Sequence, residues 1–271
     1  MSAADEVLAR HDVLGVRAAN PSPFTLEGTN TWIVGRAPAW VIDPGPSLPE
    51  HLDALAAELA RRGGLGGIAL THDHPDHAEA VGPLRERTGG TAPVAAARGD
   101  VDLTLRDGDR AGPLEALSTP GHAPDHITYV LGEVGFSGDV VLGRGSTLLL
   151  PDPGALAGYL DGLARLRARN LAVLAPGHGP LVTDPAARID DYVIHRLERE
   201  RHVLDALAAG ARSVDELLDT VWPDAAPALR LAATVTLAAH LDRLADEGLL
   251  PDGVERPQGW PPPGRLGNRA G

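Results

Sequence analysis

Short apolar runs, each bounded by glycine or proline, recur along the first two thirds of the chain. Their length and their content of valine, isoleucine and aromatic residues predict short, buried β-strands. The predicted strands cover Thr31–Val34, Trp40–Ile42, Ile68–Leu70, Val94–Ala96, Thr128–Leu131 and Leu171–Ala175.

A helical pattern separates several of these strands. Leu52, Leu55, Ala56 and Leu59 recur at positions i, i+3, i+4 and i+7, which predicts a helix over Leu48–Arg62. Strand and helix alternate too irregularly for a repeated βαβ unit, so we expect an α/β (α+β) sandwich with mixed sheets. The other predicted helices in this part cover Asp76–Thr88 and Pro153–Arg169.

After Pro185 the sequence pattern changes from short apolar runs to longer helical segments. Ser213 and Glu216 form the sequence signature of a capping box at the start of a short helix. Three helices followed by a small hairpin outline a winged-helix unit. The predicted helices are Ile189–Ala209, Ser213–Val221 and Leu229–Glu247, and the hairpin is Leu249–Val254.

We therefore expect two domains and a tail. Residues 1–188 would form the sandwich domain and residues 189–255 the winged-helix unit. Residues 256–271 are rich in proline and glycine, which is typical of a disordered tail.

Composition excludes several classes of protein. The 271 residues are 43% hydrophobic and 23% charged, which is typical of a globular chain. The chain has no cysteine, which excludes disulfide scaffolds, thiolate-bound metals and thiol nucleophiles. All 24 basic residues are arginine, and without lysine neither a Schiff-base enzyme nor a P-loop nucleotide hydrolase is expected.

The formal net charge of −13 argues against a broad basic face that binds nucleic acid or an anionic membrane. Residues 1–11 carry acidic side chains and no apolar run, unlike a secretory signal. No stretch approaches the roughly 20 apolar residues of a membrane span. We therefore expect a soluble, cytoplasmic protein. The chain has eleven histidines and no cysteine, so any metal would be held by histidines and carboxylates.

The segment Leu70-Thr-His-Asp-His-Pro-Asp-His77 carries the most chemistry. It follows a predicted buried strand, so the tight loop can direct His72 and His74 to one side. Asp76 and His77 then lie at the start of the next helix. Imidazoles and carboxylates crowded in this way need a cation as partner when they are buried.

Three further motifs place a metal-binding residue type after a β-like stretch and a glycine-containing turn. Each motif is weak alone, but the four in this order make a metal site the favoured interpretation. The three are Thr119-Pro-Gly-His122, Phe136-Ser-Gly-Asp139 and Ala175-Pro-Gly-His178.

These four motifs resemble those of the metallo-β-lactamase-fold hydrolases. The resemblance implies that residues 1–188 form an αββα catalytic domain. It also implies two metal ions, which Asp139 would bridge. It implies that the first ion is held by His72, His74 and His122, and the second by Asp76, His77 and His178. A histidine- and carboxylate-rich set without thiolates suits two Zn²⁺ ions, with Mn²⁺ or Fe²⁺ as alternatives.

The resemblance is narrower in three segments, which look like those of the lactamase-beta-2-like subgroup: residues 20–35, 136–143 and 192–204. The similarity to this subgroup extends from about Val13 to Val254. That subgroup includes a single-strand endoribonuclease. We therefore expect a binuclear hydrolase that uses a metal-bridging hydroxide on a small ester or thioester. A single-strand endoribonuclease and a mononuclear iron dioxygenase are the alternatives. Hydrolysis of β-lactams is disfavoured, because one major lactamase class needs a cysteine ligand.

Asp76 and His126 are the candidate catalytic residues. Asp76 could orient the nucleophile or carry its proton. His126 could orient a ligand, contact substrate or be an ordinary buried histidine. Family members often have a glycine pair after the first motif, where this chain has Ala78-Glu79-Ala80, and we expect Glu79 to face solvent.

Other polar segments have less specific roles. Thr29, Asn30 and Thr31 fit a turn or a cap, and residues 143–147 fit a loop beside the substrate. Between residues 190 and 250 there are twelve acidic and six basic residues, so a DNA-reading face is disfavoured and a cleft wall is expected. A small-molecule substrate is the expected partner, and RNA the alternative. Arg196, Arg199 and Arg201 could still form a local basic patch.

Overall fold

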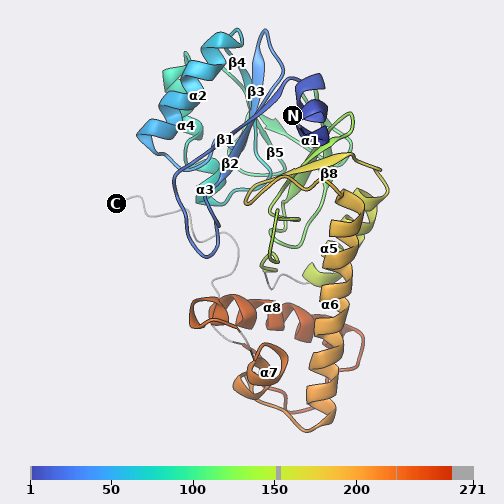
Figure 1. The fold of residues 1–271 in the computed structure, drawn as a ribbon. Helices are drawn as coiled ribbons and strands as arrows, with labels where there is room; N and C mark the ends of the chain where they lie inside the picture. Colours follow the sequence, from blue (N-terminus) through green and yellow to red (C-terminus); the bar gives the residue numbers. More distant parts are fainter. Residues whose placement is uncertain (1, 151–153, 224, 258–271) are drawn as a thin grey trace.

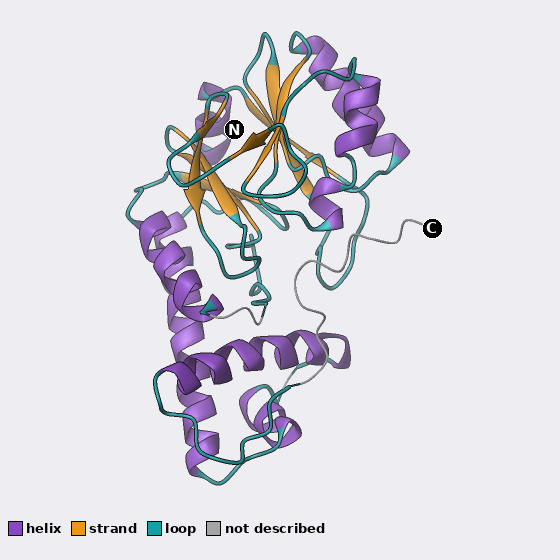
Figure 2. Ribbon diagram, turned by 180° about the vertical axis from the view of Figure 1, so that it is seen from behind, coloured by secondary structure: helices purple, strands orange, loops and turns teal. Residues whose placement is uncertain are grey.

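Two β-sheets pack face to face, with helices outside them and a separate group of helices at one end (Figures 1 and 2). This computed structural model describes residues 2–150, 154–223 and 225–257. Most of the predicted tail therefore lies outside the described residues. Among the described residues, no helix is both long and apolar enough to cross a bilayer.

The first sheet has six strands in the order β1-β2-β3-β4-β5-β6. Strands β1 to β3 pair antiparallel and β3 to β6 pair parallel. The strands are β1 (Val13–Arg17), β2 (Asn30–Val34), β3 (Ala39–Ile42), β4 (Leu65–Ala69), β5 (Val94–Ala96) and β6 (Leu103–Thr104).

The second sheet has five strands in the order β11-β10-β9-β8-β7. Only β10 and β11 pair parallel, so both sheets are mixed, as predicted. The strands are β7 (Arg110–Ala111), β8 (Leu114–Ser118), β9 (Ile127–Leu131), β10 (Val134–Gly138) and β11 (Val173–Pro176).

Alternating side chains of the strands divide the core into layers. On β3, Ile42 joins the core between the sheets, where Tyr129 and Phe136 of the second sheet are also buried. Val41 points to the other face, where it packs with Leu55 of α2 (Pro49–Arg61). Both faces of the central strands are covered, which explains their continuous apolar runs.

The predicted helix over Asp76–Thr88 is divided into α3 (Pro75–Ala78) and α4 (Val81–Arg87). The break has a tertiary cause. The Ala80 amide donates to the Gly45 carbonyl at 3.0 Å, instead of continuing the hydrogen-bond pattern of α3. Periodicity could not show this, because the competing acceptor lies 35 residues away.

Helix α1 (Ala3–Arg10) was not predicted, although Ser2 and Asp5 form a capping box at its start. Helix α5 (Ala155–Arg167) covers the second sheet, close to the predicted range. The predicted residue Pro153 lies outside the described residues.

The C-terminal unit consists of α6 (Pro185–Ala208), α7 (Val214–Val221) and α8 (Pro227–Asp246). Its three helices and the Ser213–Glu216 capping box were predicted. No strand is present in residues 248–257, so the predicted hairpin is wrong there; Glu255 instead donates its amide to the Arg212 carbonyl. The winged-helix assignment remains a prediction.

Helix α6 belongs to both units, so the predicted boundary at residue 188 falls in its first turn. Its first half packs Ile189 and Tyr192 beside α5, and its second half packs Val203 and Leu207 with α7 and α8. Figure 1 shows α6 running from the sheets into the C-terminal unit.

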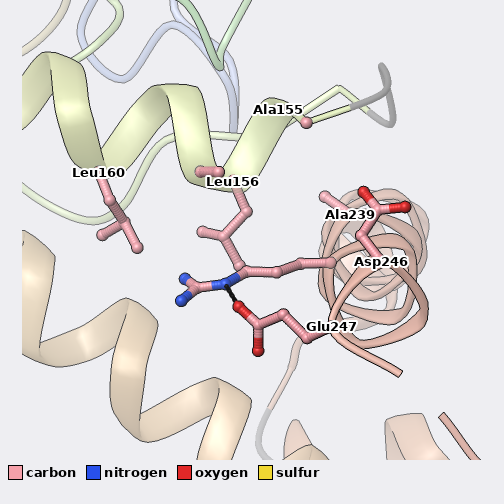
Figure 3. Close-up of a pocket in the computed structure, with 9 residues that line it drawn as sticks. Ala155, Leu156, Leu160, Ala239, Asp246 and Glu247 are labelled. Atoms are coloured by element: carbon pink, nitrogen blue, oxygen red, sulfur yellow. Dashed lines mark hydrogen bonds and ion pairs between the residues drawn. The ribbon is translucent and has the colours of Figure 1, made fainter. Parts of the chain in front are cut away.

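Helix α8 returns to the sandwich and packs against α5. Figure 3 shows Leu156 and Leu160 of α5 facing Ala239 of α8 across a small pocket of about 370 Å³. Arg243 and Glu247 also line this pocket and form an ion pair of 2.9 Å. The C-terminal unit is therefore held against the sandwich in two ways, through α6 and through the contact between α8 and α5.

Candidate metal centre

The chemistry-bearing residues follow the ends of strands at one edge of the sandwich. Strands β8, β10 and β11 run in the same direction, and they are followed by His122, Asp139 and His178. The segment from Leu70 to His77 follows β4 of the other sheet. The topology therefore brings the four sequence motifs together.

The first group contains three histidines. The Nε2 atoms of His72 and His122 each lie 3.0 Å from the Nδ1 atom of His74. His72 and His122 are buried, and His74 is half-buried and borders the cavity described below. Three ring nitrogens that converge in this way could hold one metal ion.

The second group contains Asp76, His77 and His178. The Nε2 atoms of the two histidines lie 3.3 Å apart. Asp76 Oδ2 lies 3.2 Å from His178 Nε2 and 3.6 Å from His77 Nε2. This set adds a carboxylate to two imidazoles and could hold a second ion.

Asp139 lies between the two groups. Its Oδ2 atom is 3.6 Å from His122 Nε2 and 3.4 Å from His178 Nε2, and its Oδ1 atom is 3.5 Å from His77 Nε2. Oδ1 is buried and accepts no hydrogen bond from a described residue. This carboxylate has the position that a bridging ligand needs.

The hydrogen bonds on the far side of the rings test whether the residues fit metal ions. His122 Nδ1 lies 3.0 Å from the Leu148 carbonyl, His77 Nδ1 lies 2.9 Å from an Asp43 carboxylate oxygen, and His178 Nδ1 lies 3.4 Å from the Gly28 carbonyl. These acceptors place the proton on Nδ1 and direct the Nε2 lone pair into the centre.

In these tautomers the Nε2 lone pairs of His77 and His178 face one another at 3.3 Å, and they repel unless a cation lies between them. Ligand atoms about 2.1 Å from a tetrahedral zinc ion would lie about 3.4 Å apart. The observed separations are close to that value, so the donor set fits metal ions.

Asp43 was missed by sequence reasoning. This buried residue follows β3 with a φ of 49°, and its carboxylate accepts from the Thr71 amide, from the Thr71 hydroxyl and from His77. The Thr71 hydroxyl in turn lies 2.9 Å from His72 Nδ1. Asp43 thus orients one histidine directly and, through Thr71, another in the other group.

Electrostatics differ between the groups. Burial lowers the pKa of His122 to about 4, although Asp139 opposes this shift. Burial also opposes the charged form of His178, but Asp139 and Asp76 outweigh it and raise the pKa of His178 to about 9. Positive charge is therefore favoured beside the two carboxylates, where a cation would compete with protons.

His126 is buried, and both its ring nitrogens are engaged. Nδ1 lies 3.0 Å from the Thr119 hydroxyl, and Nε2 accepts the Asp139 amide at 3.1 Å. Of the predicted roles, this arrangement fits orientation of Asp139 and leaves no nitrogen for substrate. We therefore treat His126 as a positioning residue and not as a catalytic one.

Two glycines and Asn30 bring the backbone close to the centre. A Cβ on Gly177 would lie 2.6 Å from Asp139 Oδ1, and one on Gly138 would lie 2.7 Å from His126 Nε2. The Asn30 side chain donates to the carbonyls of Pro176 and Gly179, on either side of His178. Asn30 is therefore more than a turn residue, because it fixes the His178 loop.

Two exposed acidic residues lie outside the centre. Glu79 accepts a hydrogen bond from the Ser47 amide, and it does not line the cavity, which confirms that it faces solvent. Asp73 is also exposed and forms an ion pair with Arg98.

A cavity of about 760 Å³ opens over the centre. His74, His122, Asp139 and His178 line its floor, and residues of α6, α7 and α8 line another part of its wall. The expectation that the C-terminal unit forms a cleft wall is therefore confirmed. Residues 144–147 of the loop that was expected beside the substrate also line the cavity.

Comparisons with known proteins agree with this geometry. The family model described as the metallo-beta-lactamase superfamily matches residues 24–101. A "Beta-lactamase-like protein 2 homolog" from Caenorhabditis elegans is 30% identical over 85% of this chain and 83% of its own length. An "Atrochrysone carboxyl ACP thioesterase" from Aspergillus chevalieri is 34% identical over 77% of this chain and 72% of its own length.

Solved structures resemble the chain as well. A metallo-beta-lactamase family protein from Thermus thermophilus has a TM-score of 0.70 and 26% identity, over 87% of this chain and 94% of that chain. A protein solved in a di-iron-bound form has a TM-score of 0.53 and 29% identity, over 65% and 98%.

Proposed function

Because the chain belongs to the metallo-β-lactamase superfamily, we propose that it is a binuclear metal-dependent hydrolase of a small thioester or ester. The observation that carries this proposal is the position of Asp139 between two groups of ligand atoms. The relative named as a thioesterase supports the choice of substrate class.

In this proposal His72, His74 and His122 hold one ion, and Asp76, His77 and His178 hold the other, with Asp139 shared. Zn²⁺ suits this donor set, and Mn²⁺ and Fe²⁺ are the alternatives. Two ions held there would lower the pKa of a water molecule to near neutrality and polarise the carbonyl oxygen of the scissile bond.

The protein's own residues orient the reactants. Asp43 and the Leu148 carbonyl fix the rings of His77 and His122, and His126 fixes the backbone of Asp139. Burial would raise the pKa of Asp76, but the hydrogen bond with His178 and the charges of His77 and His178 together outweigh burial and lower that pKa. Asp76 is therefore a carboxylate at neutral pH, able to accept the proton of the attacking water.

Metal analysis and turnover test this function together. We expect about two transition-metal ions per chain and hydrolysis of members of a thioester panel. Asp139→Asn should lose metal and reduce hydrolysis to below about one hundredth, because even outer partners of such ligands change activity 10- to 100-fold. Asp53→Asn, at an exposed position on α2, is the matched control. Purified protein without metal, or unchanged turnover in Asp139→Asn, would contradict the proposal.

Single-strand RNA hydrolysis is the second candidate, and one observation favours it. Three arginines line the cavity of a chain whose net charge is −13. A single-stranded RNA oligomer assayed beside the thioesters separates the two candidates. Oxygen consumption with a thiol substrate in the same assay would identify dioxygenase activity instead.

A further inference from the structure

The charges that line the cavity differ from those of the whole chain. Arg144, Arg196 and Arg199 all border it, together with five histidines. Among the described residues, Asp139 supplies its only lining carboxylate. Arg144 forms an ion pair with Glu27, which does not line the cavity. If the Asp139 carboxylate is shared between metal ions, the cavity still presents positive charge to whatever enters it.

Arg196 is a buried cation that has no counter-ion among the described residues. It is 2% exposed, its guanidinium carbon lies 5.4 Å from the centre of the Tyr159 ring, and no described residue forms an ion pair with it. Nη2 donates to the Thr147 carbonyl at 2.5 Å and to the Ser146 hydroxyl at 3.1 Å, whereas Nε has no partner in the described part of the chain. A guanidinium in this setting is costly unless an anion compensates for it.

Arg199 lies one turn further along α6 and is held in place at the cavity wall. Its Nη1 donates to the Val221 carbonyl, and its Nε lies 3.4 Å from His195 Nε2. The guanidinium carbon stands 5.5 Å from the centre of the Trp222 ring. Burial, together with the neighbouring arginines, lowers the pKa of His195 to about 4, so His195 can accept from Arg199 at neutral pH.

The same cavity also exposes apolar side chains. Phe24, from the loop before β2, is 53% exposed, and Leu229 of α8 is 39% exposed. Trp222 lines the wall between α7 and α8. Large apolar groups exposed inside a cavity of this size are typical of a ligand site.

We propose that this part of the cavity is a subsite for an apolar substrate that carries an anionic oxygen group. The anionic group binds to Arg196 and Arg199, and the apolar body contacts Phe24, Trp222 and Leu229, while the scissile bond lies at the metal centre. This inference rests on the proposed hydrolase function. The anionic group is either a carboxylate on the acyl part or a phosphate on the thiol part.

Two pairs of substrates distinguish these sources. The first pair is glutaryl-N-acetylcysteamine and its methyl ester, which differ only in the carboxylate. The second pair is a neutral hexanoyl group on 4′-phosphopantetheine and on pantetheine, which differ only in the phosphate. We expect kcat/KM to be at least tenfold higher for the charged member of one pair, since charge-assisted hydrogen bonds to arginine are strong.

Arg199→Gln tests the assignment of that preference. It should lower kcat/KM for the preferred charged substrate at least tenfold and change that of the neutral partner less than twofold. Arg199→Lys should restore part of the preference. Arg201→Gln, on the same helix but outside the cavity lining, is the matched control. Circular dichroism and melting curves check that each variant is folded.

Several results would overturn the inference while the proposed function stands. The first is equal kcat/KM for the charged and neutral members of both pairs. The second is an equal loss of kcat/KM on all thioesters in Arg199→Gln. The third is an Arg199→Gln variant that loses RNA cleavage but keeps the hydrolysis of every thioester. If the metal-loaded protein hydrolyses no thioester, the proposed function fails. Titration with non-hydrolysable thioether analogues then still tests the subsite, because Arg199→Gln should weaken binding of the charged analogue selectively.

Discussion

At the scale of single residues, the centre depends on partners behind the ligands. The Asp43 carboxylate receives three hydrogen bonds, and its contacts reach the rings of His77 and, through Thr71, His72. An acceptor at this position keeps the Nδ1 proton on His77 and leaves its Nε2 lone pair for a metal.

Asp43→Asn is therefore expected to lower metal affinity about 10- to 100-fold, because the amide NH2 group can donate a hydrogen bond to His77 Nδ1 and favour the wrong tautomer. Competition with a chelator measures this affinity directly, without any turnover. Asp53→Asn should bind metal like the wild type. Equal affinities in both variants would show that Asp43 does not orient the centre.

Sequence reasoning named the candidate ligands but missed Asp43, for a physical reason. His72, His74, Asp76 and His77 stand together in six residues, a density that few other functions need. Asp43 stands alone after a strand, and its contacts are 28 and 34 residues away. Its role is a property of the fold and not of local spacing.

At the scale of elements, one face of α6 holds the loop 142–148. Arg188, Tyr192 and Arg196 stand at i, i+4 and i+8, and they bond to the backbone of that loop. The loop in turn supplies the Leu148 carbonyl to His122. Helix α6 thus supports a ligand of the metal centre without contributing one.

Tyr192→Phe tests this support. The Tyr192 hydroxyl accepts the buried Leu142 amide at 3.0 Å, so its removal leaves that amide without a partner. We expect a loss of about 1–3 kcal/mol in the free energy of unfolding. We also expect faster hydrogen exchange at Leu142.

Denaturant unfolding and mass-resolved hydrogen exchange supply the two readouts. Asp191→Asn, at the exposed neighbouring position, is the control. Unchanged exchange at Leu142 in Tyr192→Phe would mean that the loop is held by other contacts.

The elements themselves were predictable where apolar runs or caps were strong. Strand β5 matches its predicted range, and the capping box at Ser213 begins α7 as predicted. The division between α3 and α4 was not predictable, because the Gly45 carbonyl captures the Ala80 amide from a distant loop. The hairpin predicted for Leu249–Val254 does not form there. The Glu255 amide instead donates to the carbonyl of Arg212, a residue that local sequence does not identify as a partner.

At the scale of the whole molecule, charge is distributed unevenly. The C-terminal unit is acidic in sum, yet the arginines of α6 line the cavity. Net charge alone therefore does not describe the charge that lines the cavity. Only the fold shows which side chains face inward.

The C-terminal unit should control specificity and leave metal binding unchanged, because every candidate ligand precedes α6. Trp222→Ala is expected to keep about two metal ions per chain and to raise KM for apolar substrates about tenfold, through lost contact area. Metal analysis and steady-state kinetics measure the two effects. Leu249→Ala, at an exposed position outside the cavity lining, is the control. Loss of metal in Trp222→Ala would contradict this separation.

Helix α6 also restricts how the chain can change in length. Each residue turns an α-helix by about 100° and advances it by about 1.5 Å. One residue inserted between Arg196 and Arg199 would keep the loop contacts but turn Arg199 and everything beyond it away from the cavity. The turn at residues 209–212 after α6 carries no such phase relation to the metal centre. Among related chains, we therefore expect insertions and deletions to gather in that turn and to be absent from residues 188–199.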